Sequence, residues 1–224
     1  MLNVSSLQRL FLIRHGHTFD PALETIVPGQ EAVLTSKGHE QAKLIAEFLN
    51  AHIRMDAIFC SGMQRTLQTA QPLADLQNLS VTSIPELNEL PVDVPQPPTY
   101  RQIIQAYLTL TEDLTCLPYN EVQLADGVSF RDVYQNYLSG IQKILSSNHK
   151  NIVVYAHGGT NMILLCHFMG LPFQNMMSLY QENCAINIID CLPPHHFVIR
   201  QINYTHWDPL KKLSEIGSKN SQSV

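Results

Sequence analysis

Two apolar runs that each end in a histidine and a glycine constrain the fold of this chain most. Leu10–Ile13 leads into Arg14-His15-Gly16, and Asn151–Ala156 leads into His157-Gly158-Gly159. A short apolar run bounded by a glycine turn is typical of a strand buried in a parallel sheet. Because ligands bind outside the carboxyl ends of such strands, both histidines are expected at one edge of one sheet.

The rest of the chain alternates between strand and helix patterns. Strands are predicted at 55–60, 79–84, 185–191 and 197–204, and helices at 39–49, 63–76, 128–145 and 160–169. Thr35 or Ser36 is expected to cap the first of these helices, and Ser129 the third. The helix at 63–76 is expected to break at Pro72, and Pro193-Pro194 to turn an edge hairpin. The alternation predicts an α/β fold with a mostly parallel central sheet.

The chain length and composition fit one large domain. Of the 224 residues 45% are hydrophobic, which is enough for a full core. Residues 1–210 are assigned to a single α/β domain, and the polar tail 211–224 is expected to be disordered. Residues 91–127 begin with several prolines and include a helical pattern at 100–110, so we interpret them as an insertion that lies over the site.

Charge and cysteine content narrow the function classes. The formal net charge is −5 and no long Lys/Arg block occurs, which argues against a nucleic-acid-binding protein. A cleft with local positive potential can still select a small anionic substrate. Five cysteines, an odd number with no Cys-x-x-Cys pair, fit free thiols in a reducing compartment. No signal-peptide or membrane-spanning pattern is evident, so a cytoplasmic protein is expected.

Four side chains suited to phosphoryl chemistry are expected at the carboxyl edge of the sheet. Arg14 and His15 end the first strand, Arg65 lies in the first turn of the helix after the 55–60 strand, and His157 ends a later strand. Two arginines can hold phosphoryl oxygens by paired hydrogen bonds. One histidine can attack phosphorus, and the other can donate a hydrogen bond to an oxygen. The set predicts phosphoryl transfer through His15 with no metal or other cofactor, because the arginines neutralise the charge.

A carboxylic acid must protonate the leaving oxygen and then activate water. Glu89 is the candidate for this role, and Glu86 is the reserve. Each residue also has a structural explanation: residues 14–16 as a turn with a capping arginine, Arg65 as a solvated helix charge, and Glu89 as a surface carboxylate. Their occurrence in this order, after predicted strands, favours the chemical interpretation.

A metal site is the rival interpretation of the first motif. His15 and His17 form a His-x-His pair at a strand end, as in metal-dependent hydrolases. Asp20, three residues beyond His17, breaks the usual spacing of such sites, and no His-Glu-x-x-His pair is present. Metal binding is therefore disfavoured.

Taken together, the motifs resemble those of the histidine phosphatase superfamily, also called the phosphoglycerate mutase-like family. The matching blocks are Leu12-Ile13-Arg14-His15-Gly16-His17-Thr18, Leu34-Thr35-x-x-Gly38-x-x-Gln41-Ala42, Ser61-x-x-x-Arg65-Thr66-x-x-Thr69-Ala70, Leu87-Asn88-Glu89, Ala156-His157-Gly158-Gly159 and Asn203-Tyr204-Thr205-His206. The resemblance implies a three-layer αβα fold and a phosphohistidine intermediate at His15. It also implies phosphate binding by Arg14, Arg65 and His157, and proton donation by Glu89.

The sequence departs from the family pattern at several places. His17 stands where the family often has Glu, Gly or Ser, and Pro21 where it has Asn. Pro91-Val92-Asp93 replaces the usual Gly-x-Trp/Leu-Glu-Gly after Glu89, and Gly127-Val128-Ser129 replaces Gly-Glu-Ser. These positions lie where the family sets its choice of substrate.

The leading hypothesis is a metal-independent phosphatase that hydrolyses a small phosphorylated metabolite, with neither a nucleic acid nor a membrane as partner. Phosphoglycerate mutase-type transfer is the enzyme alternative, but long insertions that would retain the intermediate are hard to find in 224 residues. A catalytically weak phosphate-binding regulatory protein is the third hypothesis. The intact set of two arginines, two histidines and Glu89 argues against it.

Overall fold

The computed structural model describes residues 7–18, 32–94, 99–192 and 196–206. The strands are β1 (Gln8–Arg14), β2 (Ala57–Cys60), β3 (Val81–Ser83), β4 (Asn151–Ala156), β5 (Ile186–Leu192) and β6 (His196–Tyr204). The α-helices are α1 (Ser36–His52), α2 (Gln64–Gln77), α3 (Tyr100–Cys116), α4 (Phe130–Leu145) and α5 (Gly158–Met169). Short 3-10 helices are η2 (Pro85–Leu87), η3 (Ala125–Gly127) and η4 (Phe173–Leu179).

One six-stranded sheet forms the centre of the fold, in the order β3-β2-β4-β1-β5-β6. The pairs β2/β3, β2/β4 and β1/β4 are parallel, whereas β5 pairs antiparallel with β1 and with β6. The mostly parallel sheet is therefore confirmed, with the antiparallel hairpin at one edge. Its predicted turn at Pro193-Pro194 lies outside the described residues, as does the 211–224 tail.

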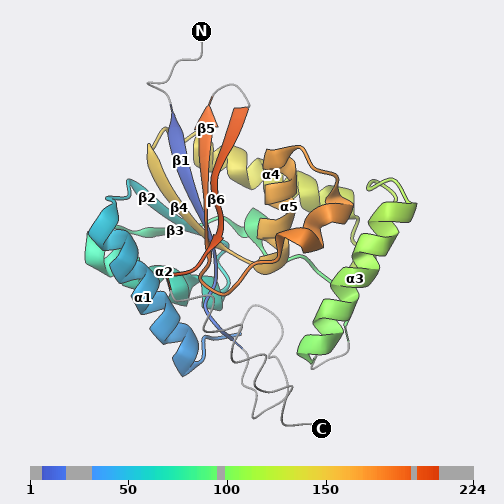
Figure 1. Cartoon of the computed structure of the whole chain (residues 1–224), viewed down its shortest axis with the longest axis horizontal. Coiled ribbons are helices and arrows are strands. Elements are labelled where there is room, and N and C mark those ends of the chain that lie inside the picture. Colours follow the sequence, from blue (N-terminus) through green and yellow to red (C-terminus); the bar gives the residue numbers. More distant parts are fainter. Residues whose placement is uncertain (1–6, 19–31, 95–98, 193–195, 207–224) are drawn as a thin grey trace.

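Helices cover both faces of the sheet and give three layers (Figure 1). Alternate residues of a strand point to opposite faces. On β1, Phe11 and Ile13 pack in a core with residues of α1 and α2, whereas Leu10 and Leu12 pack in a second core with residues of α4 and α5. Both faces of the central strands are thus buried, which explains their unbroken apolar runs.

Most predicted elements are present, and the largest correction concerns α2. This helix runs without a break from Gln64 to Gln77, with Pro72 inside it. A proline in a helix interior removes one hydrogen bond. Ala70, Leu73 and Ala74 are buried in the core between α1, α2 and the sheet, and this packing stabilises the continuous helix.

The other differences concern the ends of elements. Thr35 is the N-cap of α1 and accepts a hydrogen bond from the Gly38 N–H, as predicted. Ser129 is the N-cap residue of α4 but its side chain makes no capping hydrogen bond. The helix predicted at 100–110 continues to Cys116, and β3 is only three residues long. All five cysteines are free thiols, as predicted.

The segment interpreted as an insertion contributes α3, which stands beside the body of the domain in Figure 1. Tyr107, Leu110 and Leu114 on its inner side are buried in the same core as α4 and α5. Among the described residues, no single helix is both long and apolar enough to cross a membrane, and α5 with η4 reaches that composition only as a pair bent by 116°.

The turn after β1 lies directly against the first turn of α1. A Cβ at Gly16 would lie 2.7 Å from the Gly38 carbonyl oxygen, and a Cβ at Gly38 would overlap the His17 carbonyl oxygen. The Thr35 N–H donates to the same His17 oxygen over 2.9 Å. Glycine at both positions therefore allows the backbone to place His15 next to α1.

We expect Gly38→Ala to lower the free energy of unfolding by about 3 kcal/mol, because the added methyl group overlaps backbone atoms that cannot move independently. Gly158→Ala is the matched control, since its Cβ would meet its nearest neighbour at an ordinary 3.5 Å. Urea denaturation of both variants measures the difference. Equal stability of the two variants would contradict the close approach.

Candidate active site

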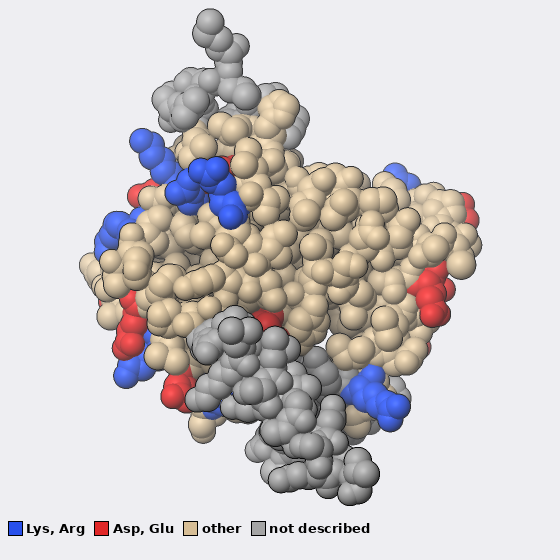
Figure 2. Space-filling view, in the orientation of Figure 1, with Lys and Arg blue, Asp and Glu red and all other residues tan. Residues whose placement is uncertain are grey.

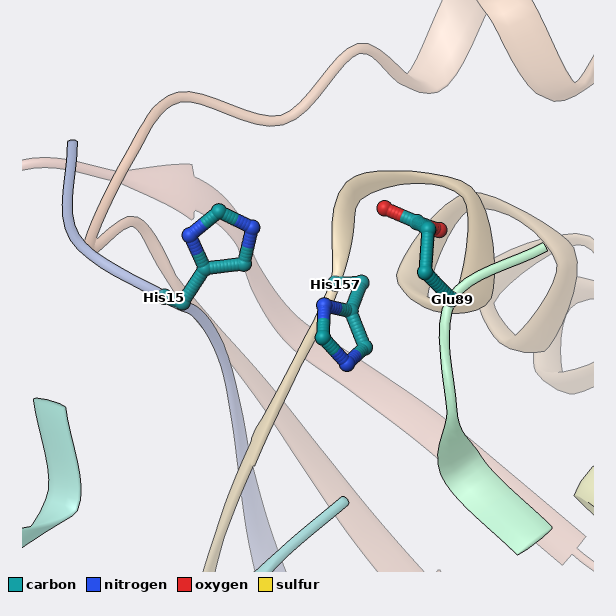
Figure 3. A group of neighbouring side chains, drawn as sticks. All are labelled: His15, Glu89 and His157. Carbon is teal, nitrogen blue, oxygen red and sulfur yellow. The ribbon is translucent and has the colours of Figure 1, made fainter. Parts of the chain in front are cut away.

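The two histidines lie side by side because β1 and β4 are parallel neighbours in the sheet. Arg14 pairs with Ala156 in the register, and the His15 N–H donates to the Ala156 carbonyl over 3.0 Å. The residue that follows each of these strands is a histidine. Their ring centroids are 5.3 Å apart, with an interplanar angle of 63°. In the view of Figure 3 the His157 ring lies between the side chains of His15 and Glu89.

His15 is oriented with one nitrogen free for chemistry. Its Nδ1 lies 2.7 Å from the Gly16 carbonyl oxygen, which can only accept, so Nδ1 carries the proton and Nε2 the lone pair. The ring is buried. Burial, followed by the charges of Arg65 and Arg14, holds its pKa well below the ordinary histidine value. A neutral imidazole with an exposed lone pair is a nucleophile.

His157 is held from the opposite side. Its Nε2 lies 2.7 Å from Ser61 Oγ, just before α2. Its Nδ1 is buried without a hydrogen-bond partner in the described part of the chain. Burial, then Arg65, His15 and Arg14, lower the pKa of His157 well below its ordinary value. Both rings are therefore neutral at neutral pH.

Two guanidinium groups make the pocket positive. Arg14 donates from Nη1 to the Gln181 carbonyl oxygen over 2.6 Å, and its buried Nε has no hydrogen-bond partner among the described residues. Arg65 is 8% exposed in the first turn of α2. Burial lowers the pKa of Arg65, the nearby Glu89 carboxylate raises it, and the charge of Arg14 lowers it. Both arginines keep their charge and can pair with an anion.

Glu89 follows η2 and reaches the amino end of α5. Its Oε1 accepts hydrogen bonds from the Leu90 and Gly159 N–H groups at 3.0 Å and from the Thr160 N–H at 3.4 Å. One atom each of Glu89, His15 and His157 lie within 4.8 Å of one another. The five predicted residues are thus brought together. The reserve, Glu86, instead forms an ion pair with Lys143 of α4.

The structure places the His17 ring of the His-x-His pair against Thr35, the N-cap residue of α1. The His17 ring forms a hydrogen bond with Thr35 Oγ1 through Nδ1, at 2.9 Å. The backbone N–H of His17 donates to Gln41 Oε1. His17 therefore joins the turn to α1. His15, Glu89 and His157 are ligand types that a divalent cation accepts, but the adjacent guanidinium groups make the pocket favour an anion.

The sequence motifs did not identify three residues of the site. Ser61 lies in the same motif block as Arg65, but the motif assigned no function to it. Tyr107 of α3 is buried and hydrogen-bonded to Glu89, and burial and that carboxylate raise its pKa well above the ordinary tyrosine value. Gln181 holds Arg14 through a backbone carbonyl, which any residue type could supply.

The neutral histidines make stability depend on pH. Unfolded, His15 and His157 each bind a proton below about pH 6.5, whereas the folded protein keeps them neutral, so acidification favours unfolding. Between about pH 5 and 6.5 we expect each to reduce the free energy of unfolding by at most about 1.4 kcal/mol per pH unit. In urea denaturation, the free energy of unfolding of the double variant His15→Gln/His157→Gln should change less with pH than that of the unchanged protein. An equal change with pH in both proteins would contradict the lowered pKa values of the two histidines.

The chain is similar to several phosphatases along most of its length. It is 24% identical to 2-carboxy-D-arabinitol-1-phosphatase of Triticum aestivum, over 99% of the chain and 46% of that protein. The chain thus spans about half the length of this curated relative. It is 28% identical to adenosylcobalamin/alpha-ribazole phosphatase of Escherichia coli, over 81% of the chain and 89% of that protein.

Structural similarity agrees. A crystal structure of a putative alpha-ribazole-5'-P phosphatase from Escherichia coli superposes with a TM-score of 0.70 and 25% identity, over 88% of this chain and 96% of that one. Residues 10–205, which include all five candidate residues, match the family model of the histidine phosphatase superfamily, branch 1. The chain therefore belongs to the histidine phosphatase superfamily.

Proposed function

We propose that the chain is a metal-independent phosphomonoesterase that acts on a small phosphorylated metabolite through a phosphohistidine at His15. The observation that carries this proposal is the orientation of His15. Its Nδ1 is hydrogen-bonded to the Gly16 carbonyl, so the lone pair lies on Nε2, and the charges of Arg65 and Arg14 act on the ring. A neutral nucleophile beside two fixed positive charges is suited to attack on a phosphoryl group.

In the first step the arginines bind the phosphoryl oxygens, and His15 Nε2 forms a bond to phosphorus as the ester P–O bond breaks. Glu89, protonated, gives its proton to the leaving oxygen. In the second step Glu89 takes a proton from water, the oxygen of that water bonds to phosphorus, and the N–P bond breaks. Glu89 suits both steps because it is only partly buried, so that water can reach it.

Hydrolysis is favoured over mutase-type transfer, and catalysis over ligand binding alone. The similar proteins include phosphatases and probable phosphoglycerate mutases, so the choice between the two reactions rests on the site. A mutase must keep its intermediate from water, whereas here the acid–base group is partly exposed. A protein that only binds phosphate would need neither an oriented lone pair on His15 nor a carboxylate within 4.8 Å of it.

We further propose that the 91–127 segment covers the site through Tyr107. A Cβ at Gly159 would overlap the Tyr107 hydroxyl and lie 2.8 Å from Glu89 Oε1, so both groups lie over the first turn of α5. The hydroxyl is hydrogen-bonded to Glu89 and stays protonated, because burial raises its pKa. Tyr107 thereby joins α3 to the acid–base residue.

A small substrate also fits the surface. On the face shown in Figure 2, Lys and Arg side chains are scattered and form no continuous basic stripe. A nucleic-acid-binding surface would gather such charges along one face. The positive groups of the pocket, by contrast, are Arg14 and Arg65, which suit a single phosphoryl group.

We expect the purified chain to hydrolyse a generic phosphomonoester with a chelator present, and His15→Ala to lower kcat by at least ~10³-fold, because the nucleophile is lost. Phosphate release measures this. His39→Ala, which removes an exposed histidine on α1, is the matched control and should keep full activity. Hydrolysis that survives in His15→Ala, or that requires added metal, would overturn the mechanism.

The acid role of Glu89 predicts a dependence on the leaving group. For alkyl phosphates, Glu89→Gln should slow first-turnover alcohol release by ~10²–10³-fold, because a poor leaving group needs the proton. Activated aryl phosphates should lose less than about tenfold. Tyr107→Phe should show the same selectivity, to a smaller degree and with little change in KM. An equal loss for both substrate classes would assign the proton donor elsewhere.

A further inference from the structure

A row of three short contacts runs from His157 into the first turn of α2. His157 Nε2 lies 2.7 Å from Ser61 Oγ, Ser61 Oγ lies 3.0 Å from Thr66 Oγ1, and Thr66 Oγ1 lies 2.7 Å from the Met63 carbonyl oxygen. Each contact needs one proton between its two atoms, because facing lone pairs at such distances repel. The row therefore needs three protons.

The three protons have only one possible arrangement. The carbonyl of Met63 supplies none, and the hydroxyl groups of Ser61 and Thr66 supply one each. Thr66 must donate to the carbonyl, so Ser61 must donate to Thr66. The third proton then belongs to His157 Nε2, which donates to Ser61. The Met63 N–H also donates to Ser61 Oγ, at 3.3 Å, and completes its hydrogen bonds.

This arrangement leaves the lone pair of neutral His157 on Nδ1, which faces the pocket. Nδ1 is buried and lacks a hydrogen-bond partner among the described residues, and Figure 3 shows a ring nitrogen of His157 turned toward His15. His15 presents its own lone pair at Nε2. A phosphoryl dianion has only acceptor oxygens, so it cannot form a hydrogen bond with His157 Nδ1 unless a proton is added.

We propose that the site binds a phosphoryl dianion together with one proton, held between His157 Nδ1 and a phosphoryl oxygen. This inference rests on the proposed function. The proton comes from solution, and no other bond forms or breaks on binding. This proton allows His157 Nδ1 and the phosphoryl oxygen, which otherwise are both acceptors, to form a charge-assisted hydrogen bond. Ser61 is a positioning residue, because by accepting from Nε2 it keeps the lone pair on the pocket side.

The charges around His157 tie this proton to the anion. Arg14 and His15 approach from β1, Arg65 from α2, and Glu89 and Tyr107 from the side of α5. In the empty pocket burial and the two arginines keep the ring neutral. A bound dianion places two negative charges beside the ring and reverses the local field. The proton therefore binds with the anion and not before it.

A dependence of binding on pH follows. Above the second pKa of a phosphate monoester, about 6, the ligand is a dianion and must collect the proton from solution. Its apparent affinity should then fall about tenfold per pH unit, by linkage. Below this pKa the monoanion brings the proton with it, and no further uptake is needed.

Titration calorimetry of the full chain with a simple alkylphosphonate, which is not hydrolysed and whose dianion has only acceptor oxygens, tests the proposal. At about pH 9, where the phosphonate is a dianion, heats in two buffers of different ionisation enthalpy should give uptake of about one proton per phosphonate bound. In Ser61→Ala the imidazole loses its acceptor and can turn its proton to Nδ1, so uptake should fall to near zero. Ser83→Ala, which changes a serine at the end of β3, is the matched control and should keep the uptake.

Nitrogen-15 NMR of the histidine rings gives a second readout. His157 should be protonated at Nε2 in the ligand-free protein and at both nitrogens with the phosphonate dianion bound. Phosphonate binding without proton uptake, or a ligand-free His157 protonated at Nδ1, would overturn this inference and leave the proposed function intact. Absence of both phosphonate binding and phosphomonoester hydrolysis would overturn the proposed function itself.

Discussion

The parallel pairing of β1 with β4 is the constraint on which the site depends. Its register places Arg14 opposite Ala156, so the residues that follow, His15 and His157, leave the sheet together. A slip of one residue would turn every side chain of β1 to the other face and separate the two rings. Burial on both faces opposes that slip, because each face of β1 packs in its own hydrophobic core.

Close backbone approaches then set how tightly the pocket is enclosed. Gly16 meets Gly38 of α1, and Gly159 meets the Tyr107 hydroxyl and Glu89. At both places a side chain would occupy space that backbone or functional atoms now fill. The two glycines thus act on different sides of the site. Gly16 allows α1 to approach His15, and Gly159 leaves room for Glu89 and Tyr107 at the amino end of α5.

Sequence patterns predicted the sheet, most helices and the five candidate residues, because each signal is local. An apolar run, a glycine turn and a charged residue after a strand all lie within a few positions of one another. The errors arise where distant contacts decide. Packing of Ala70, Leu73 and Ala74 stabilises α2 through Pro72, and the ion pair with Lys143 draws Glu86 away. The role of Tyr107 depends on Glu89, which lies in another element, and the role of Gln181 depends on a backbone carbonyl that no residue type marks.

The pocket combines two permanently charged arginines with two histidines that are neutral. Arg14 and Arg65 remain charged at any relevant pH and attract the anion. The same charges, with burial, keep His15 and His157 neutral, which suits the proposed attack of His15 on phosphorus. A pocket with imidazolium groups in the empty state would bind phosphate more strongly but would lack a nucleophile. In the proposed scheme both rings are neutral before binding and His157 gains a proton only with the anion, which reconciles binding with attack by His15. By accepting from Nε2, the hydroxyl of Ser61 keeps the lone pair of His157 on Nδ1, the nitrogen that faces the pocket.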